Sequence, residues 1–304
     1  MMISFIRPII SFPQHLRLGT HRMSQKCYST NTDTPPLYLR EGLLAVDKPL
    51  GLTSQDVVGK IRRIIETDAK ARGVQDHRKK RRKPWTKVGH GGTLDPLATG
   101  VLVIGVGRGT KNLQQYLTGS KAYQAGIELG FQTTTLDLDP KGEIVGREDF
   151  DHVTQKAILD VLPQFRGTIE QIPPIFSALK RGGKKLYELG REGKTAEDVI
   201  IEPRQVQIHA LDPIWKEEEN FPKTFGIDVE CGGGTYIRSL VRDIGIALGT
   251  LATMTSLQRS KQGVFRLEHC LGENDWTVEN ICQAIEDGDE LLKLYDTVEG
   301  ARAE

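Results

Sequence analysis

Cysteine is scarce in this chain of 304 residues, and long apolar runs are absent. The four cysteines lack the paired spacing of a zinc site and the density of a disulfide framework: they are Cys27, Cys231, Cys270 and Cys282. We expect reduced thiols that pack as small hydrophobic side chains. No apolar run approaches the ~18 residues that a membrane-spanning helix requires. The sequence therefore predicts no metal centre and no membrane partner.

Acidic residues are absent from positions 1–32, although the whole chain is nearly neutral at a net charge of +1. The same stretch carries scattered arginines, serines and apolar residues, a composition typical of a mitochondrial transit peptide. We therefore expect residues 1–37 to be a transit peptide or a disordered leader, and the protein to be mitochondrial. Met23 offers a second start, and initiation there would add a product in the nucleus or cytoplasm.

A phosphate-binding loop of the Walker type is also lacking. Residues 107–111, with the sequence GRGTK, combine glycines with a lysine but do not place Gly-Lys-Ser/Thr at the required interval after a glycine. We interpret this segment as the entry to a helix rather than as a nucleotide site.

One run of cations stands out against the neutral chain. It consists of Arg78, Lys79, Lys80, Arg81, Arg82 and Lys83. Blocks of like charge repel and are usually solvated. Three interpretations stay open: a solvated loop, a nuclear localisation signal, and a contact with a nucleic-acid backbone. The run lies in a polar segment, 66–87, that directly precedes the most informative stretch of the chain.

That stretch is residues 88–107, VGHGGTLDPLATGVLVIGVG. Its glycines allow a tight turn or a close approach of the backbone to a ligand. Asp95 is its single carboxylate, and Pro96 favours an extended conformation at Asp95, which directs the side chain. Residues 101–106 form an apolar run that predicts a buried strand. The local chemistry leaves two interpretations, an active-site acid or a plain Asp-Pro turn.

The remaining pattern predicts an α+β fold with a largely antiparallel sheet. Strands are expected from apolar runs or alternation at 42–47, 101–106, 121–129, 204–214, 224–231 and 253–265. Helices are expected from apolar residues at helical spacing from Thr53 or Ser54 onward and at 111–117, 150–165, 236–248 and 278–295. A turn-rich link at 137–142 predicts that residues 142–145 pair with the strand 121–129 in a hairpin.

Residues 89–100, GHGGTLDPLATG, closely resemble the signature of the TruB family of tRNA pseudouridine synthases. Further family motifs follow in family order: VDKPLG at 46–51, KAY at 121–123, the segment 169–188, GTYIRS at 234–239 and LQR at 257–259. Ordered matches over so much of the chain favour the active-site interpretation of Asp95. The resemblance implies a pseudouridine-synthase fold, in which helices and loops flank a central mixed sheet around one catalytic cleft.

The resemblance also implies a reaction without a cofactor or metal. A uridine is detached from its ribose, rotated and rejoined through C5. Asp95 is then the catalytic aspartate, either as a nucleophile or by removing a sugar proton, and Arg238 orients it as a bidentate cation. Tyr123 stacks on the uracil. Because the target must leave its stack, Asp95, Tyr123, Tyr236 and Arg238 should line one cleft with apolar walls.

Further site residues are implied for substrate binding: His90, Tyr236, Leu257, Asp137, Lys48 and Pro49. His90 matches a residue that contacts the nucleotides displaced by flipping, and Asp137 an acid that recognises the extruded base. Lys48 and Pro49 match supports behind the catalytic loop. The run 132–135, QTTT, replaces the usual Arg-Thr-Asp-Thr-like run, which puts the network around Asp137 in question.

The segment 169–197 resembles the insertion with which the family grips tRNA. Its candidates for contact with the RNA backbone are Lys180, Lys184 and Lys185. With 38–298 as the catalytic domain, we expect no C-terminal RNA-binding domain of the kind found on many members. The resemblance predicts a monomer that converts uridine 55 in the T-loop of tRNA, with messenger RNAs as additional targets.

Two alternatives belong to other functional classes. One is the RNA-guided branch of the same superfamily, against which the lack of a C-terminal domain argues. The other is an RNA-binding or tRNA-folding chaperone with an inactive site. The presence of Asp95, Tyr123 and Arg238 together argues against an inactive site.

Overall fold

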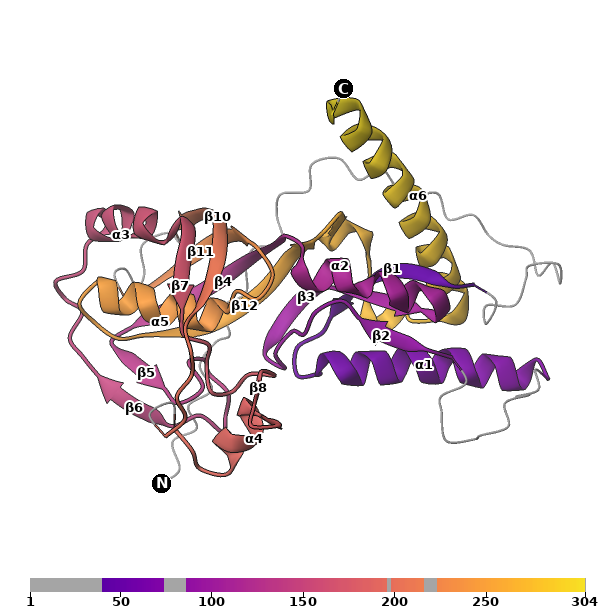
Figure 1. Cartoon of the computed structure of the whole chain (residues 1–304). Helices are drawn as coiled ribbons and strands as arrows, with labels where there is room; N and C mark the ends of the chain where they lie inside the picture. The colour runs from indigo at the N-terminus through magenta and orange to yellow at the C-terminus, as the bar shows by residue number, and fades with distance from the viewer. Residues whose placement is uncertain (1–39, 74–85, 196–197, 216–222, 304) are drawn as a thin grey trace.

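The structure, a computed structural model, describes residues 40–73, 86–195, 198–215 and 223–303 (Figure 1). The predicted leader and the cationic run 78–83 lie outside these residues. Within the described ranges, no helix has the length and hydropathy that crossing a membrane requires.

One mixed sheet of ten strands organises the chain, in the order β14-β1-β3-β12-β4-β11-β10-β7, with β2 beside β3 and β13 beside β12. Its strands are β1 Gly42–Lys48, β2 Val88–His90, β3 Ala98–Val106, β4 Lys121–Leu129, β7 Gly167–Gln171, β10 Arg204–Ile214, β11 Thr224–Cys231, β12 Ala252–Gln262, β13 Phe265–Arg266 and β14 Cys270–Leu271. The pairs β1–β14 and β3–β12 run parallel, and the other pairs run antiparallel. The predicted α+β class with a largely antiparallel sheet is confirmed.

Helices and two small ribbons complete the described chain. The ribbons are β5 Phe131–Thr133 with β6 Ile144–Arg147, and β8 Lys180–Arg181 with β9 Lys184–Lys185. The helices are α1 Ser54–Ala71, α2 Leu113–Thr118, α3 Gln155–Val161, α4 Leu186–Arg191, α5 Ile237–Ala247 and α6 Val278–Ala303. Short 3₁₀ turns occupy Gly107–Asn112, Leu162–Phe165, Leu267–His269 and Glu273–Asp275.

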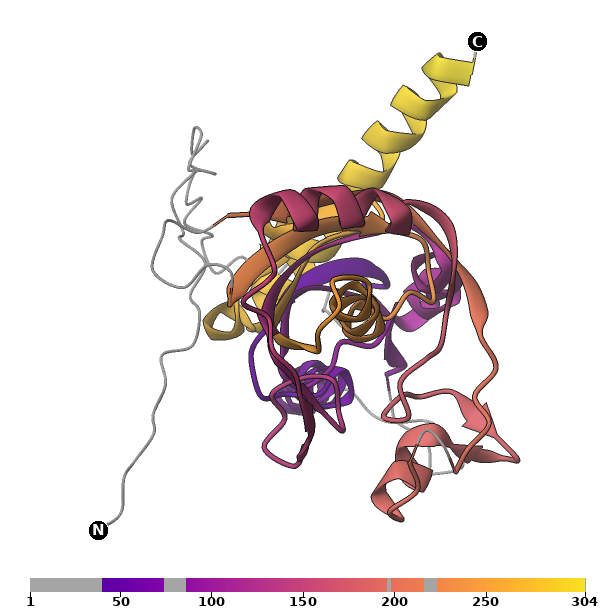
Figure 2. The same cartoon turned by 90° about the vertical axis from the view of Figure 1, so that its left-hand side faces the viewer.

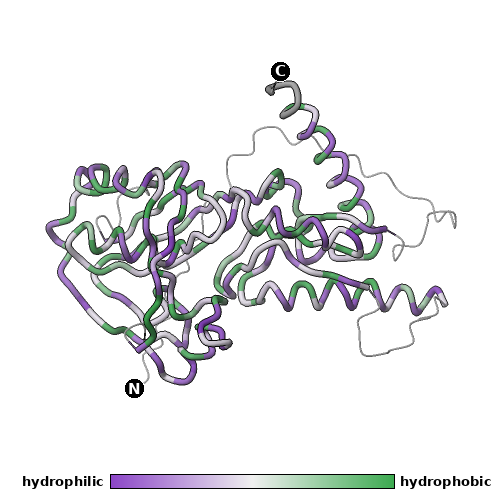
Figure 3. The backbone as a smooth tube through the Cα atoms, in the orientation of Figure 1, coloured by the Kyte–Doolittle hydropathy of each residue, from purple (hydrophilic) through white to green (hydrophobic). Residues whose placement is uncertain are grey.

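The start of α1 is set by local side-chain chemistry. Thr53 Oγ1 accepts a hydrogen bond from the Asp56 backbone N at 3.0 Å, and Asp56 Oδ2 accepts one from the Thr53 backbone N at 2.9 Å. This capping box satisfies N–H groups that the helix itself leaves unpaired. Apolar residues then recur at helical spacing and bury one face of α1, and hydropathy alternates along the helix in Figure 3.

The main core is filled by α1 and α5. Ile61 of α1 and Leu240 of α5 belong to one cluster with Leu102 and other strand residues. Figure 2 looks nearly along both helices and shows them beneath the curved sheet. Val103 of β3 points to the opposite face, where it packs with Tyr116. β3 is therefore buried on both faces, which explains its unbroken apolar run.

The predicted pairing of residues 142–145 with the strand 121–129 is wrong. β4 lies between β12 and β11, and β6 pairs with β5 instead. Gly130, at φ +94°, follows the end of β4 and turns the chain out of the sheet. The turn at 137–142 therefore closes a separate ribbon, whereas the partners of β4 come from distant parts of the chain.

Three helices differ in extent from their predictions. α3 begins later than expected because Thr154 caps it, with Oγ1 accepting from the Ala157 backbone N at 3.1 Å. α6 continues to Ala303 and stands away from the body of the fold in Figure 1. α1 continues to Ala71, so the first residues of the polar segment 66–87 are helical.

The segment 169–197 begins inside the main sheet, because β7 pairs with β10 as an edge strand. The chain leaves the sheet after Gln171 and forms β8, β9 and α4. These elements surround a small core of their own, built on Ile175, Leu186 and Val199. Residues 169–171 are therefore part of the sheet, and the excursion from it starts at residue 172.

Gly100 lies where β3 and β12 pair in parallel, opposite Arg259. Its φ is +100°, and an added Cβ would lie 2.3 Å from the Arg259 carbonyl oxygen. We expect Gly100→Ala to lower the free energy of unfolding by about 3 kcal/mol or more, because a backbone clash adds to backbone strain. Urea denaturation measures this loss.

Gly51→Ala is the matched control. Gly51 also has a positive φ, +84°, but an added Cβ would meet no atom within 4 Å. Backbone strain alone should lower its free energy of unfolding by about 1–2 kcal/mol. Equal losses in the two variants would contradict the close packing assigned to Gly100.

Candidate active site

Hydrogen bonds hold the loop that carries Asp95 from several sides. The Ser54 hydroxyl accepts from the Leu94 backbone N at 2.8 Å and donates to the Leu94 carbonyl at 3.1 Å. The Gly51 backbone N donates to the Pro96 carbonyl at 2.8 Å. Bonds on both sides of Asp95 fix the direction in which its carboxylate leaves the chain, and such fixed geometry is what positioned catalysis requires.

Lys48 supports the same loop from inside the protein. Its side chain is fully buried, and Nζ donates to the carbonyls of Pro49 at 2.9 Å, Leu52 at 2.6 Å and Pro96 at 3.3 Å. Burial lowers the pKa of Lys48 to about 8. Lys48 therefore holds the loop from inside the protein, and the Pro49 carbonyl is one of the acceptors that fix it.

Lys48→Met should flatten the pH dependence of stability. Burial penalises the charged lysine fully below pH 8, and the penalty fades as the pH rises from about 8 towards 10.5, the unfolded value. Across this window Lys48 makes the wild-type free energy of unfolding rise with pH, by up to about 1.4 kcal/mol per pH unit. Urea denaturation at several pH values should show a smaller rise in the variant. Identical slopes would contradict a buried, charged Lys48.

Arg238, in the first turn of α5, faces Asp95. Its Nε lies 2.9 Å from Asp95 Oδ2, and its two Nη atoms donate to the Thr135 and Phe176 carbonyls at 2.9 Å each. The Arg238 side chain is 5% exposed, whereas that of Asp95 is 34% exposed. A buried and fully engaged guanidinium thus orients a carboxylate that remains accessible.

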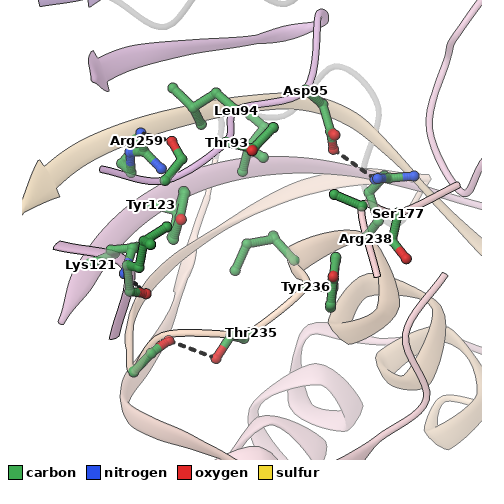
Figure 4. A pocket seen from close by; sticks show the side chains of 17 residues that line it. Thr93, Leu94, Asp95, Lys121, Tyr123, Ser177, Thr235, Tyr236, Arg238 and Arg259 are labelled. Atoms are coloured by element: carbon green, nitrogen blue, oxygen red, sulfur yellow. Dashed lines mark hydrogen bonds and ion pairs between the residues drawn. The ribbon is translucent and has the colours of Figure 1, made fainter. Parts of the chain in front are cut away.

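A cavity of about 290 Å³ opens beside this pair (Figure 4). Its volume is near the lower end of small-molecule sites and suits a single planar base. The four residues expected to share a cleft, Asp95, Tyr123, Tyr236 and Arg238, all line it, and so does Leu257. They come from the loop before β3, from β4, from the start of α5 and from β12.

The aromatic walls are set by the sheet and by α5. Tyr123 lies in β4, beside β12, and is buried. Tyr236 precedes α5, and its backbone N donates to Gln171 Oε1 at 2.8 Å. Burial raises the pKa of both tyrosines, so each hydroxyl keeps its proton at neutral pH. Both side chains can therefore offer an apolar ring and a hydrogen-bond donor.

Asp137 lies behind Arg238, with Oδ2 3.8 Å from Nε. Burial raises the pKa of Asp137, and the Arg238 charge opposes this shift. The Thr133 and Thr135 hydroxyls donate to the Asp137 carbonyl at 2.7 and 3.2 Å, so threonines build an intact network here. Asp137 is not among the residues that line the cavity, and its predicted contact with the extruded base stays a prediction.

His90 also lies outside the cavity. It stands in β2, where its Nδ1 accepts from the Gly92 backbone N at 3.3 Å. Burial lowers the pKa of the His90 ring, which is therefore neutral at pH 7. Its predicted contact with displaced nucleotides stays a prediction.

The lysines predicted to contact RNA lie on the β8–β9 ribbon. Lys180 and Lys184 are exposed, and Lys184 Nζ pairs with a glutamate. Tyr187, in the adjoining α4, has two cations near its ring, with Lys185 Nζ 5.3 Å and Arg191 Cζ 5.2 Å from the ring centre. This placement gives a cationic, aromatic surface, and its contact with RNA stays a prediction, as does that of the run 78–83 outside the described residues.

Five polar residues that received no role in the sequence analysis also line the cavity: Thr93, Lys121, Ser177, Thr235 and Arg259. Lys121 precedes Tyr123 by two positions, and Arg259 follows Leu257 by two. Strand alternation places each on the same face as its neighbour, so this signal was present in the sequence. Ser177 lies in the excursion from the sheet, where no local pattern marks it.

Comparison with known proteins supplies the family. The profile described as TruB family pseudouridylate synthase (N terminal domain) matches residues 79–237. The pseudouridylate synthase TRUB1 of Mus musculus is 42% identical over 252 residues, which cover 83% of this chain and 72% of that protein. The chain belongs to the TruB family. A TruB relative from Acaryochloris marina, tRNA pseudouridine synthase B, is 41% identical over 248 residues, or 81% of this chain and 75% of the relative.

Solved structures agree with the TruB-family fold. A chain of a Cbf5-Nop10-Gar1 complex matches with a TM-score of 0.54 at 28% identity. The match covers 86% of this chain but 64% of that chain, which is less than two thirds. The pseudouridine-synthase fold predicted from the motifs is confirmed.

Within the residues that the structure describes, no three His, Cys, Asp or Glu side chains are grouped as a metal site would need. Cys231 is buried, Cys270 and Cys282 are partly buried, and all three are free thiols. The expectation that the TruB-family reaction here needs neither metal nor cofactor stays a prediction.

Proposed function

We propose that this chain is a tRNA pseudouridine synthase that isomerises uridine 55 in the T-loop of tRNA. The observation that carries the proposal is an accessible carboxylate, Asp95, which Arg238 fixes beside a base-sized cavity. Membership of the TruB family supplies the reaction class, and relatives at 41–42% identity are named pseudouridylate or tRNA pseudouridine synthases.

The reaction begins with a uridine that leaves its stack and enters the cavity. Tyr123 and Leu257 replace the lost contacts of neighbouring bases with an aromatic face and an apolar side chain. Asp95 then faces the ribose. It either attacks C1′ or removes the proton from C2′, and both routes need the carboxylate in a fixed direction, which Arg238 provides.

The detached base rotates inside the cavity and rejoins the sugar through C5. C5 loses a proton and N1 gains one, so the product is an isomer of the substrate. The Tyr123 hydroxyl, neutral because burial raises its pKa, relays this proton. The cavity keeps the base close to C1′ between the two steps.

Recognition of the T-loop uses shape and stacking, as RNA recognition generally does. The β8–β9 ribbon contacts the RNA backbone, and Tyr187 of α4, with two cations near its ring, contacts an unstacked base. The protein acts as a monomer, with messenger RNAs as additional substrates. Its leader directs it to mitochondria, and initiation at Met23 gives a second product in the nucleus or cytoplasm.

The activity is tested with an unmodified tRNA transcript and the purified chain. We expect pseudouridine at position 55 and at no other uridine of the T-loop. A transcript with cytidine at position 55 is the control and should give no product. A transcript in which uridine 55 stays unmodified would contradict the proposed function.

A further inference from the structure

The two ends of the cavity differ in charge. Asp95 and Arg238 form an ion pair at one end, whereas Lys121 and Arg259 lie towards the other, near Tyr123 (Figure 4). Three cations therefore line the cavity against one carboxylate, an excess of two positive charges.

The two cations near Tyr123 are buried without a carboxylate. Lys121 is 6% exposed and Arg259 is 1% exposed. Lys121 Nζ donates to the carbonyls of Leu117 at 3.0 Å and Gly119 at 2.7 Å. In the described part of the chain, neither cation has an acidic side chain within ion-pair distance. Their bonds go to backbone carbonyls and, for Arg259, also to the Tyr123 hydroxyl.

Burying two cations without a carboxylate costs free energy of folding unless another anion binds beside them. Buried cations are normally paired, because desolvation disfavours the charged form. Burial and the Arg259 charge lower the pKa of Lys121 to about 8, so the lysine keeps most of its charge at pH 7. The free protein thus holds an unbalanced positive field at one end of the cavity, and an anion there would offset it.

The proposed reaction generates that anion. When the N1–C1′ bond breaks, its electron pair leaves with the base and spreads over N1, O2 and O4. On one route Asp95 bonds to C1′, and this bond breaks when C5 attacks, so that its electron pair returns to the carboxylate. On the other route Asp95 takes the C2′ proton, the C2′–H electron pair forms a C1′=C2′ double bond, and the proton returns to C2′ when C5 bonds to C1′. The same electron pair forms the C5–C1′ bond, and a proton passes from C5 to N1. The base is therefore anionic between the two bond-making steps.

We propose that Lys121 and Arg259 form an anion site that stabilises the detached uracil. Fixed charges aimed at a charge that develops only during reaction lower the barrier without strengthening substrate binding. This inference rests on the proposed function. It assigns the base to the Lys121–Arg259 end and the ribose to the Asp95–Arg238 end.

Lys121 is the better residue to test, because Arg259 also fastens the fold. Arg259 Nε donates to the Val101 carbonyl at 2.6 Å and Nη2 to the Gly92 carbonyl at 3.2 Å. Lys121→Met removes the charge at similar length, and Lys121→Arg restores it. Lys261→Met is the matched control, because Lys261 pairs with Glu230 outside the cavity.

The experiment compares two T-arm transcripts, with uridine or 5-fluorouridine at the target position. The fluorinated base is the stronger acid, so its anion needs less stabilisation. The single-turnover rate of target consumption should fall about 10²-fold with uridine in Lys121→Met, but about tenfold or less with 5-fluorouridine. Lys121→Arg should recover part of the uridine rate, and Lys261→Met should match the wild type on both transcripts.

The ratio of the uridine rate to the 5-fluorouridine rate is the deciding quantity. Any loss of folded protein lowers both rates equally and cancels in this ratio. Equal slowing on both transcripts would overturn the anion site and leave Lys121 a structural role. An unchanged uridine rate would overturn it as well. Failure of the wild type itself on both transcripts would instead overturn the proposed function, and the anion site with it.

Discussion

Asp95→Asn is expected to reduce pseudouridine formation by about 10⁴-fold or more, because the amide can neither attack C1′ nor remove a proton from C2′. The substitution keeps the size of the side chain and an oxygen that can accept from Arg238. The loop itself depends on bonds of Ser54, Leu94 and Pro96, which the change leaves in place. Stability and tRNA affinity should therefore stay close to those of the wild type.

The measurement is single-turnover conversion of a tRNA transcript at saturating enzyme, with affinity determined separately by filter binding. Asp212→Asn is the matched control. Asp212 pairs with Arg166 on the protein surface, away from the cavity, and its loss should leave the rate unchanged. An Asp95→Asn variant with a rate near that of the wild type would remove Asp95 from the chemistry.

Arg238→Lys is expected to lower the single-turnover rate by about 10²–10³-fold, the second largest effect. Lysine keeps the charge but cannot reach Asp95 and the Thr135 and Phe176 carbonyls together. Asp95 loses its fixed direction, and the Thr135 carbonyl, in buried surroundings, and the part-buried Phe176 carbonyl lose their donors. The free energy of unfolding should also fall by about 1–3 kcal/mol, because an unpaired buried carbonyl carries its full desolvation cost.

Arg242→Lys provides the comparison for this variant. Arg242 lies one turn further along α5 and pairs with its neighbour Asp243, outside the cavity. The same chemical change there should leave the rate unchanged and cost little stability. If Arg238→Lys and Arg242→Lys gave the same rate, the orienting role of Arg238 would be wrong.

Local chemistry made much of the fold predictable. The capping residue Thr53, the alternation in β10 and β11 and the apolar run of β3 each act within a few residues. They predicted the start of α1, the bounds of β10 and β11 and most of β3. The hairpin partner of β4 was predicted wrongly, because β11 and β12 are distant in sequence. Turn signals report only where the chain reverses, and pairing between distant strands depends on the whole sheet.

For the site, too, the sequence predicted some features, whereas others depend on tertiary packing. The motifs identified Asp95, Tyr123, Tyr236 and Arg238, and the structure brings them around one cavity. They did not separate residues that line the cavity from residues that support it. Asp137 lies behind Arg238, and hydrogen bonds of its own loop hold it there. Tertiary packing, not a local motif, determines whether such a residue lines the cavity.

For Lys121 and Arg259, the position at the site was predictable from the sequence, but the chemical role was not. Lys121 and Arg259 share strand faces with Tyr123 and Leu257, so alternation alone placed them at the site. Their chemistry could not be inferred from the sequence, because it depends on the absence of a nearby carboxylate. Only the arrangement of the described side chains shows that both cations face the cavity without an acidic partner.

We expect one cavity to receive an extruded uridine with its ribose at Asp95 and its base between Tyr123 and Leu257. The decisive measurement is a crystal structure of Asp95→Asn with a T-arm stem-loop. Uridine 55 should lie inside the cavity, with C1′ facing residue 95 and the uracil ring against Tyr123. A target base that stays stacked in the loop, or that lies outside the cavity in this complex, would contradict this expectation.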